Sequence, residues 1–186
     1  MDYSGGVFAD FWCHIADVVF WAIQPKGLKS IQARGEAPEG IVDTPKWIEV
    51  DYEFEGLNLY WTSEPPDVPG AADKSIWAYF EGNKGTLLTN YSSREIRIDG
   101  KMVNDLEEIQ QTITRSPGHQ QNFVDAVKSR SQPESNLAYA REMTLPMHLG
   151  LISFRLGGRK LNWNAEKEKF VGDAAANKLL SRKPRK

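Results

Sequence analysis

Residues 47–61 read WIEVDYEFEGLNLYW, and apolar and charged side chains alternate along this stretch as far as Phe54. A repeat of two residues is typical of a β-strand with one apolar and one charged face. Glu55-Gly56 then predicts a tight turn, after which apolar side chains again occupy every second position. We therefore expect a β-hairpin here.

Strands and helices are predicted in separate parts of the chain around this hairpin. Short segments that favour strands are residues 28–33, 76–81, 85–89, 95–98, 101–103 and 160–163. Helical spacing of apolar residues is found over residues 7–23, from about 119 to 130, from about 135 to 156 with Ser135 as the N-cap, and over 173–180. This order predicts an α+β fold with an open, predominantly antiparallel β-sheet and helices packed on one face.

Length, charge and cysteine content limit the function. The chain has 186 residues and a formal net charge of −2, so we expect one domain over residues 1–180, a basic tail over residues 181–186, and no nucleic-acid partner. No apolar run approaches the roughly 20 residues that span a bilayer, so no membrane partner is expected. The single cysteine, Cys13, excludes an internal disulfide and a multi-cysteine metal site, and we expect it to be a small buried hydrophobe.

The strongest candidate site lies on the first predicted helix, in the segment GGVFADFWCHIAD of residues 5–17. Asp10, His14 and Asp17 are separated by four and three residues, so their side chains share one helix face. Trp12 is close enough in sequence to stack on a sugar ring, but its offset of about 160° to 200° from the other two side chains favours core packing.

Three interpretations of this helix face remain open from spacing alone. His14 can be a satisfied structural histidine beside surface aspartates. It can also be a general acid/base for a substrate hydroxyl, with Asp10 holding the substrate or the imidazole. The same side chains can instead ligate a divalent metal, with His119 or His148 as a further ligand. His119 can line the substrate cleft or cap a helix, whereas His148 is expected to pack in the core.

The glycine pair followed by Asp-x-x-x-His-x-x-Asp resembles the first-helix motif of the substrate domain in the Gfo/Idh/MocA oxidoreductases. Further segments resemble later landmarks of one branch of that family, and the resemblance extends from Gly5 to about Leu180; these segments are residues 51–56, 82–87, 116–123 and 136–142. The resemblance implies the C-terminal domain fold of that family, similar to the C-terminal domains of dihydrodipicolinate reductase and glyceraldehyde-3-phosphate dehydrogenase.

The resemblance also implies a role for each matched residue. Asp10 and His14 correspond to the catalytic, substrate-binding pair, and Asp17 to the third position of the motif. The implied substrate is a carbohydrate or polyol, the implied cofactor is NAD or NADP, and the sheet is expected to mediate homo-oligomer formation. The acid/base interpretation is thereby favoured over the metal one, and no metal ligand is assigned.

The chain departs from the family pattern in its cofactor motifs. It contains no G-x-G-x-x-G fingerprint and no Glu-Lys-Pro motif, and Gly157-Gly158 follows a helix instead of joining a strand to one. We therefore expect the N-terminal Rossmann domain to be absent, any cofactor to be bound by a missing domain or a separate chain, and this chain alone to be inactive. Localisation is not predicted beyond a cytoplasmic default, since an export signal would lie in the missing part.

Two other classes of function are kept as alternatives. The first is a non-catalytic module that dimerises through the sheet and binds carbohydrate or protein. The second is a metal-dependent lyase or hydratase that acts on a keto-sugar through Asp10, His14 and Asp17.

Overall fold

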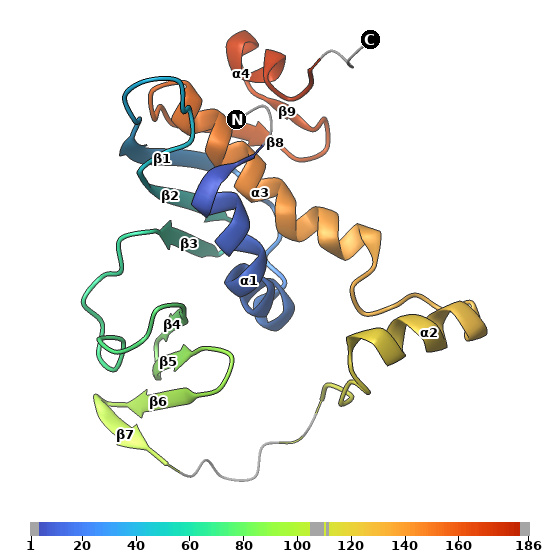
Figure 1. The fold of residues 1–186 in the computed structure, drawn as a ribbon. Coiled ribbons are helices and arrows are strands. Elements are labelled where there is room, and N and C mark those ends of the chain that lie inside the picture. The colour runs from blue at the N-terminus through green and yellow to red at the C-terminus, as the bar shows by residue number, and fades with distance from the viewer. Residues whose placement is uncertain (1–3, 105–109, 111, 183–186) are drawn as a thin grey trace. The chain divides into compact units, whose positions relative to one another are not determined.

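A computed structural model describes residues 4–104, 110 and 112–182 (Figure 1). Contacts within the chain define two compact units among these residues: Met1–Ala78 together with Met143–Lys186, and Tyr79–Glu142. Each unit is described by itself. The single domain expected over residues 1–180 stays a prediction, and residues 183–186 of the basic tail lie outside the described residues.

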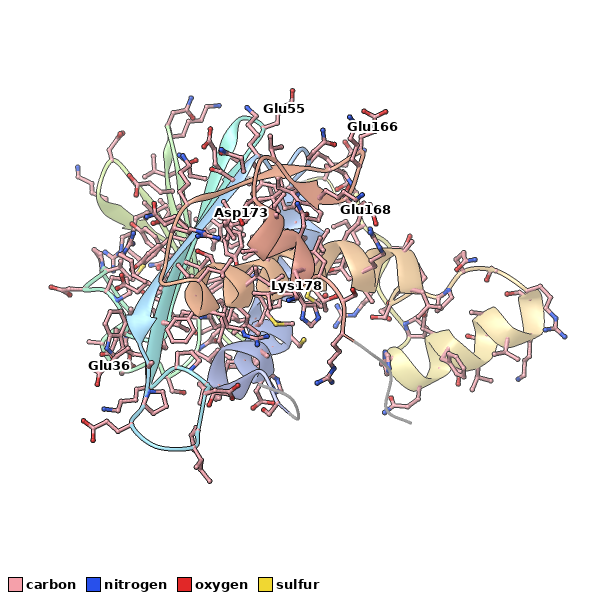
Figure 2. All side chains as sticks on the ribbon, turned by 90° about the horizontal axis from the view of Figure 1, so that it is seen from above. Glu36, Glu55, Glu166, Glu168, Asp173 and Lys178 are labelled. Atoms are coloured by element: carbon pink, nitrogen blue, oxygen red, sulfur yellow. The ribbon has the colours of Figure 1, made fainter. Side chains whose placement is uncertain are left out.

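The first unit is built on an antiparallel sheet. In the described part of the chain its five strands have the order β3-β2-β1-β8-β9. Their bounds are β1 Ser30–Glu36, β2 Trp47–Phe54, β3 Leu57–Thr62, β8 Leu161–Asn164 and β9 Lys169–Phe170. Phe54 pairs with Leu57 across a turn in which Gly56 has a φ of 72°, which confirms the predicted hairpin. Figure 2 shows Glu36 and Glu55 at opposite ends of this sheet.

One face of this sheet forms the core of the unit. The β2 side chains that alternate with the charged ones are buried, as the period of two predicts; they are Ile48, Val50, Tyr52 and Phe54. Helix α1 (Gly6–Ile23) and the part of helix α3 (Leu137–Arg155) that follows Glu142 cover this face (Figure 1). The Trp12 ring of α1 lies 5.5 Å from the Tyr52 ring, and Ser153 Oγ of α3 accepts a hydrogen bond from the Ala33 amide at 2.9 Å.

The other face of the sheet is polar. Arg34 of β1 contacts Asp51 Oδ2 at 2.6 Å and Glu49 Oε2 at 3.3 Å, both on β2. Glu53 pairs with Lys160 at 3.3 Å. These ion pairs are mostly exposed, so each contributes little to stability, at most about 1 kcal/mol. Their alternation with the buried side chains nevertheless defines which face of the hairpin packs against the helices.

Helix α1 is apolar along much of its surface. Its 18 residues have a mean hydropathy of 1.4, which by length and composition alone would allow it to cross a membrane, whereas the sequence was expected to contain no such segment. Five of its side chains are buried against the sheet and α3, and the other residues of the helix are at least partly exposed; the buried five are Phe8, Trp12, Ile15, Ala16 and Phe20.

The second unit contains a smaller sheet of the order β4-β5-β6-β7 within the described residues. Its strands are β4 Ala78–Gly82, β5 Gly85–Thr89, β6 Arg94–Ile98 and β7 Lys101–Val103, followed by helix α2 (His119–Ser129). Antiparallel pairing aligns Leu87, Ile96 and Val103. The predicted strands therefore form two antiparallel sheets instead of one open sheet, and the α+β class is confirmed.

The helix ends of the C-terminal part are capped by side chains. Asn136 Oδ1 accepts a hydrogen bond from the Tyr139 amide at 3.0 Å, so Asn136 caps α3 and the assignment of that role to Ser135 was wrong. Asp173, which is labelled in Figure 2, caps helix α4 (Ala174–Lys178) by accepting a hydrogen bond from the Ala176 amide at 2.8 Å, and it also pairs with Arg159. Both caps satisfy amides that have no partner inside their own helix.

Candidate functional site

The glycine pair before α1 determines where the helix starts. A Cβ at Gly5 would lie 2.4 Å from Ala9 Cβ and 3.1 Å from Leu151 Cδ1 of α3. Gly6 has a φ of 71°, and a Cβ there would lie 2.8 Å from Thr44 Cβ. Larger residues would therefore push α1 away from both neighbours. The glycine pair places the first turn of α1 close to α3. This contact determines which side of α1 is directed away from the core.

The other face of α1 carries the three predicted polar side chains. Asp10, His14 and Asp17 are all exposed, and they follow one another along the helix at spacings of four and three residues. Because Trp12, Ile15 and Phe20 anchor the opposite side in the core, the three polar groups cannot turn inward without unpacking the unit. The structure thus brings together the residues that the sequence motif predicts.

The negative charge on this face of α1 affects the neighbouring thiol of Cys13. The residue is exposed, so the prediction of a small buried hydrophobe was wrong. Partial desolvation raises the pKa of the Cys13 thiol, and the negative charges of Asp10 and Asp17 raise it further. Both carboxylates therefore act on one point of the helix, directly beside His14. The face is a site of negative potential around an imidazole.

Phe11 adds an aromatic ring to this face, and sequence reasoning missed it. Its side chain is 42% exposed, and its ring centroid lies 6.0 Å from that of His14 with an angle of 55° between the planes. The signal was present in the sequence, because residues three positions apart on a helix are neighbours on its surface. Phe11 and His14 therefore form an exposed pair of rings.

Trp12 lies in the core. Its side chain is 0% exposed, and Nε1 donates a hydrogen bond of 2.8 Å to the Met143 carbonyl. Phe8, Phe20 and Trp61 surround the indole ring with centroid separations of 5.4 to 6.1 Å. The helical offset predicted this packing, and the ring has no exposed face on which a sugar could stack.

The two remaining histidines lie on other helices, His119 on α2 and His148 on α3. His119 is exposed and is the first residue of α2 in the second unit, where Gly118 is the N-cap and no side chain caps the helix. His148 is exposed on α3, so the prediction of a packed core histidine was wrong. Its neighbours Met147 and Leu149 take the buried positions, and partial burial lowers the pKa of the imidazole.

The metal-binding interpretation gains no support from the geometry. In the part of the chain that the structure describes, no group of three or more His, Cys, Asp or Glu side chains is arranged to hold a metal ion. Asp10, His14 and Asp17 share a face but are spread along about 10 Å of helix. Among the described residues, the three side chains therefore do not converge on one point where an ion could bind.

The glycines that could have held a dinucleotide serve another purpose. Gly157 and Gly158 both have a φ of 77° and join α3 to β8. A Cβ at Gly158 would lie 2.5 Å from the Ala33 carbonyl oxygen, so this glycine allows close packing of the loop against β1. A pyrophosphate-binding turn joins a strand to a helix, and this turn does the reverse. Gly157 and Gly158 thus do not form a pyrophosphate-binding turn.

The chain thus combines an α+β fold of two antiparallel sheets with a first helix that carries Asp10, His14 and Asp17 on its exposed face. The model of the oxidoreductase family C-terminal alpha/beta domain, of the Gfo/Idh/MocA group, matches residues 1–186. The chain belongs to this family.

A solved structure has the same fold. It is an oxidoreductase from Agrobacterium radiobacter in complex with NAD+, L-tartaric acid and magnesium, with a TM-score of 0.54 and 12% sequence identity. The similarity covers 79% of this chain and 46% of that one, so this chain spans less than half the length of that oxidoreductase. No curated protein matches the chain significantly.

Proposed function

We propose that this chain is the substrate-side domain of an NAD(P)-dependent oxidoreductase that acts on a sugar or polyol. The observation that carries the proposal is the exposed row of Asp10, His14 and Asp17 on a helix whose opposite side is locked in the core. Family membership supports the reaction class, and the nucleotide in the similar solved structure supports the choice of cofactor.

Each side chain has a distinct role in this proposal. His14 exchanges a proton with the substrate hydroxyl that is oxidised, because imidazole changes its protonation state near neutral pH more readily than other side chains. Asp10, one turn earlier, accepts a hydrogen bond from a neighbouring hydroxyl and so orients the substrate. Asp17 contributes negative charge at the far end of the row.

The cofactor is held outside the residues described here. NAD or NADP supplies the hydride acceptor when bound, and a Rossmann domain, in the same protein or in a separate chain, would bind it. The isolated chain is therefore expected to show no dehydrogenase activity. Absorbance at 340 nm during incubation with NAD+ or NADP+ and a panel of sugars tests this expectation, and steady production of reduced cofactor would refute it.

Substrate binding gives a test that does not need the cofactor. Saturation-transfer NMR of the chain with D-glucose and D-sorbitol is expected to show binding that weakens several-fold in the His14→Ala and Asp10→Asn variants. His148→Ala is the matched control, because it removes an exposed histidine from α3 instead of α1. Absence of binding by the unsubstituted chain would contradict the proposed function. Binding that is unchanged in both α1 variants would instead favour the non-catalytic module.

Self-association through the polar face of the larger sheet is the second part of the proposal. Tyr60 of β3 is 47% exposed there and is paired in register with Asp51. An aromatic side chain among charged groups is typical of interfaces that are both polar and packed. Analytical ultracentrifugation should find a dimer or higher oligomer, which Tyr60→Glu dissociates by adding charge beside Asp51. Tyr91→Glu, in the second unit, is the control, and a monomeric unsubstituted chain would refute this part.

A further inference from the structure

Phe11 lies on the exposed side of α1, next to His14. It follows Asp10 directly, its ring is 42% exposed, and it lies 6.0 Å from the ring of His14. The two planes meet at 55°, so the rings do not stack face to face, and the phenyl ring is not covered by the imidazole. An exposed aromatic ring thus lies beside the imidazole that is proposed to deprotonate the substrate, one residue after Asp10.

The chemistry of a phenyl face favours one kind of substrate. A six-membered sugar ring presents several C–H bonds on one flat face, and these carry a partial positive charge that the negative face of an aromatic ring attracts. An open-chain polyol has the same hydroxyl groups but no flat face, and it loses more rotational freedom when it is bound. A site with hydroxyl-binding groups alone would not distinguish the two as strongly.

We propose that Phe11 is a specificity-determining residue that makes this site prefer the ring form of a sugar over an open-chain polyol. This inference rests on the proposed function, and it assigns the substrate class within it. The C–H face of the sugar packs on Phe11, while hydroxyl groups on the edge of the ring reach Asp10 and His14. Phe11 also holds the imidazole in place through the contact between the two rings.

D-glucose and D-sorbitol form a matched pair of probes, because they differ mainly in the presence of the ring. Dissociation constants from NMR titration are expected to favour glucose by about twofold to tenfold in the unsubstituted chain, the range of one aromatic contact. Phe11→Leu keeps an apolar side chain but removes the aromatic face, and it should abolish this preference. Phe11→Tyr keeps the aromatic face and should therefore retain the preference for glucose. Trp21→Leu is the control, since Trp21 is an exposed aromatic of the same helix about 15 Å further along.

The same variants report the contact between the rings without any ligand. In Phe11→Leu the ring protons of His14 should shift in the NMR spectrum, because the ring current of Phe11 is lost, whereas Trp21→Leu should leave them unchanged. A circular dichroism spectrum checks that each variant is folded.

The outcomes separate this inference from the function on which it rests. A preference for glucose that survives Phe11→Leu would overturn the role of Phe11, and the proposed function would stand if His14→Ala still weakens the binding of both probes. Equal binding of glucose and sorbitol by the unsubstituted chain would likewise overturn the inference alone. Binding of neither probe would remove the proposed function and the inference together.

Discussion

A close approach between α3 and β2 in the core predicts a specific coupling between these two elements. Gly150 of α3 faces Tyr52 of β2, and a Cβ at position 150 would lie 2.6 Å from Tyr52 Oη, 3.2 Å from Val50 Cγ1 and 3.3 Å from Phe8 Cε1. Tyr52 is 1% exposed, and its hydroxyl has no hydrogen-bond partner among the residues that the structure describes. Burial raises the pKa of this phenol well above its usual value, so it stays neutral. The perturbation is Gly150→Ala, alone and with Tyr52→Phe.

The magnitudes follow from these contacts. Overpacking of a tight core costs about 1–3 kcal/mol, and alanine recovers up to about 1 kcal/mol through its higher helix propensity. Gly150→Ala alone should therefore lower the free energy of unfolding by about 1–2 kcal/mol. Tyr52→Phe removes a buried hydroxyl that has no partner, so it should be neutral or stabilising by up to about 1 kcal/mol. In the double variant the 2.6 Å contact with Tyr52 Oη no longer exists. The remaining contacts of the new Cβ, with Val50 and Phe8, are short but need only small shifts of these side chains.

The double variant should consequently be more stable than the sum of the single effects by about 1–2 kcal/mol. Urea denaturation of all four proteins, followed by far-UV circular dichroism, measures this coupling. Equal destabilisation by Gly150→Ala in both backgrounds would refute the reasoning, because it would show that the hydroxyl is not the group that limits the space. A strong loss of stability in Tyr52→Phe would refute the other premise, because it would show that the hydroxyl of Tyr52 has a hydrogen-bond partner.

Three further predictions concern a buried hydroxyl, a helix cap and the candidate site. Ser153→Ala should lower the free energy of unfolding by about 1–3 kcal/mol in urea denaturation, because the Ala33 amide and the Arg159 carbonyl each lose a buried partner at 2.9 and 2.8 Å. A loss below about 0.5 kcal/mol, which is typical of a surface substitution, would contradict this. Asn136→Ala should cost about 1 kcal/mol by the same measurement, whereas Ser135→Ala should cost almost nothing. Cys13 should react with iodoacetamide at pH 8 more slowly than free cysteine, because its raised pKa reduces the thiolate fraction, and Asp10→Asn should accelerate the reaction; an unchanged rate would show that this carboxylate does not act on the thiol.

Local patterns predicted most of the secondary structure. The alternation in residues 47–54 and the turn at Gly56 were sufficient for the hairpin, because register and burial follow from a period of two. The short strand β9, at Lys169–Phe170, was missed because two residues are too few to show a periodic pattern. The division of the strands into two sheets was also missed. Which strands pair depends on contacts between distant residues, and the alternation within a strand contains no information about its neighbour.

Only those features of the candidate site that follow from regular helix geometry could be predicted from the sequence. The common face of Asp10, His14 and Asp17 and the inward direction of Trp12 follow from 3.6 residues per turn. The exposure of Cys13 and His148 does not, because both lie at positions where the width of the buried face depends on how α1 and α3 pack. Average residue preferences suggested burial for both, and the actual packing overrode them.

The exposure of the α1 face also bears on why this domain would need a second one. Charges that face water interact weakly, since a pair at 4 Å gains only about 1 kcal/mol at the dielectric constant of bulk water. Transfer of a proton and a hydride is more efficient in a site from which water is excluded. Asp10, His14 and Asp17 are exposed in this chain, so its own residues do not provide that environment. A cofactor-bearing domain that covers α1 would supply both the hydride acceptor and the exclusion of water, and for this reason we expect addition of free NAD+ alone to leave the chain inactive.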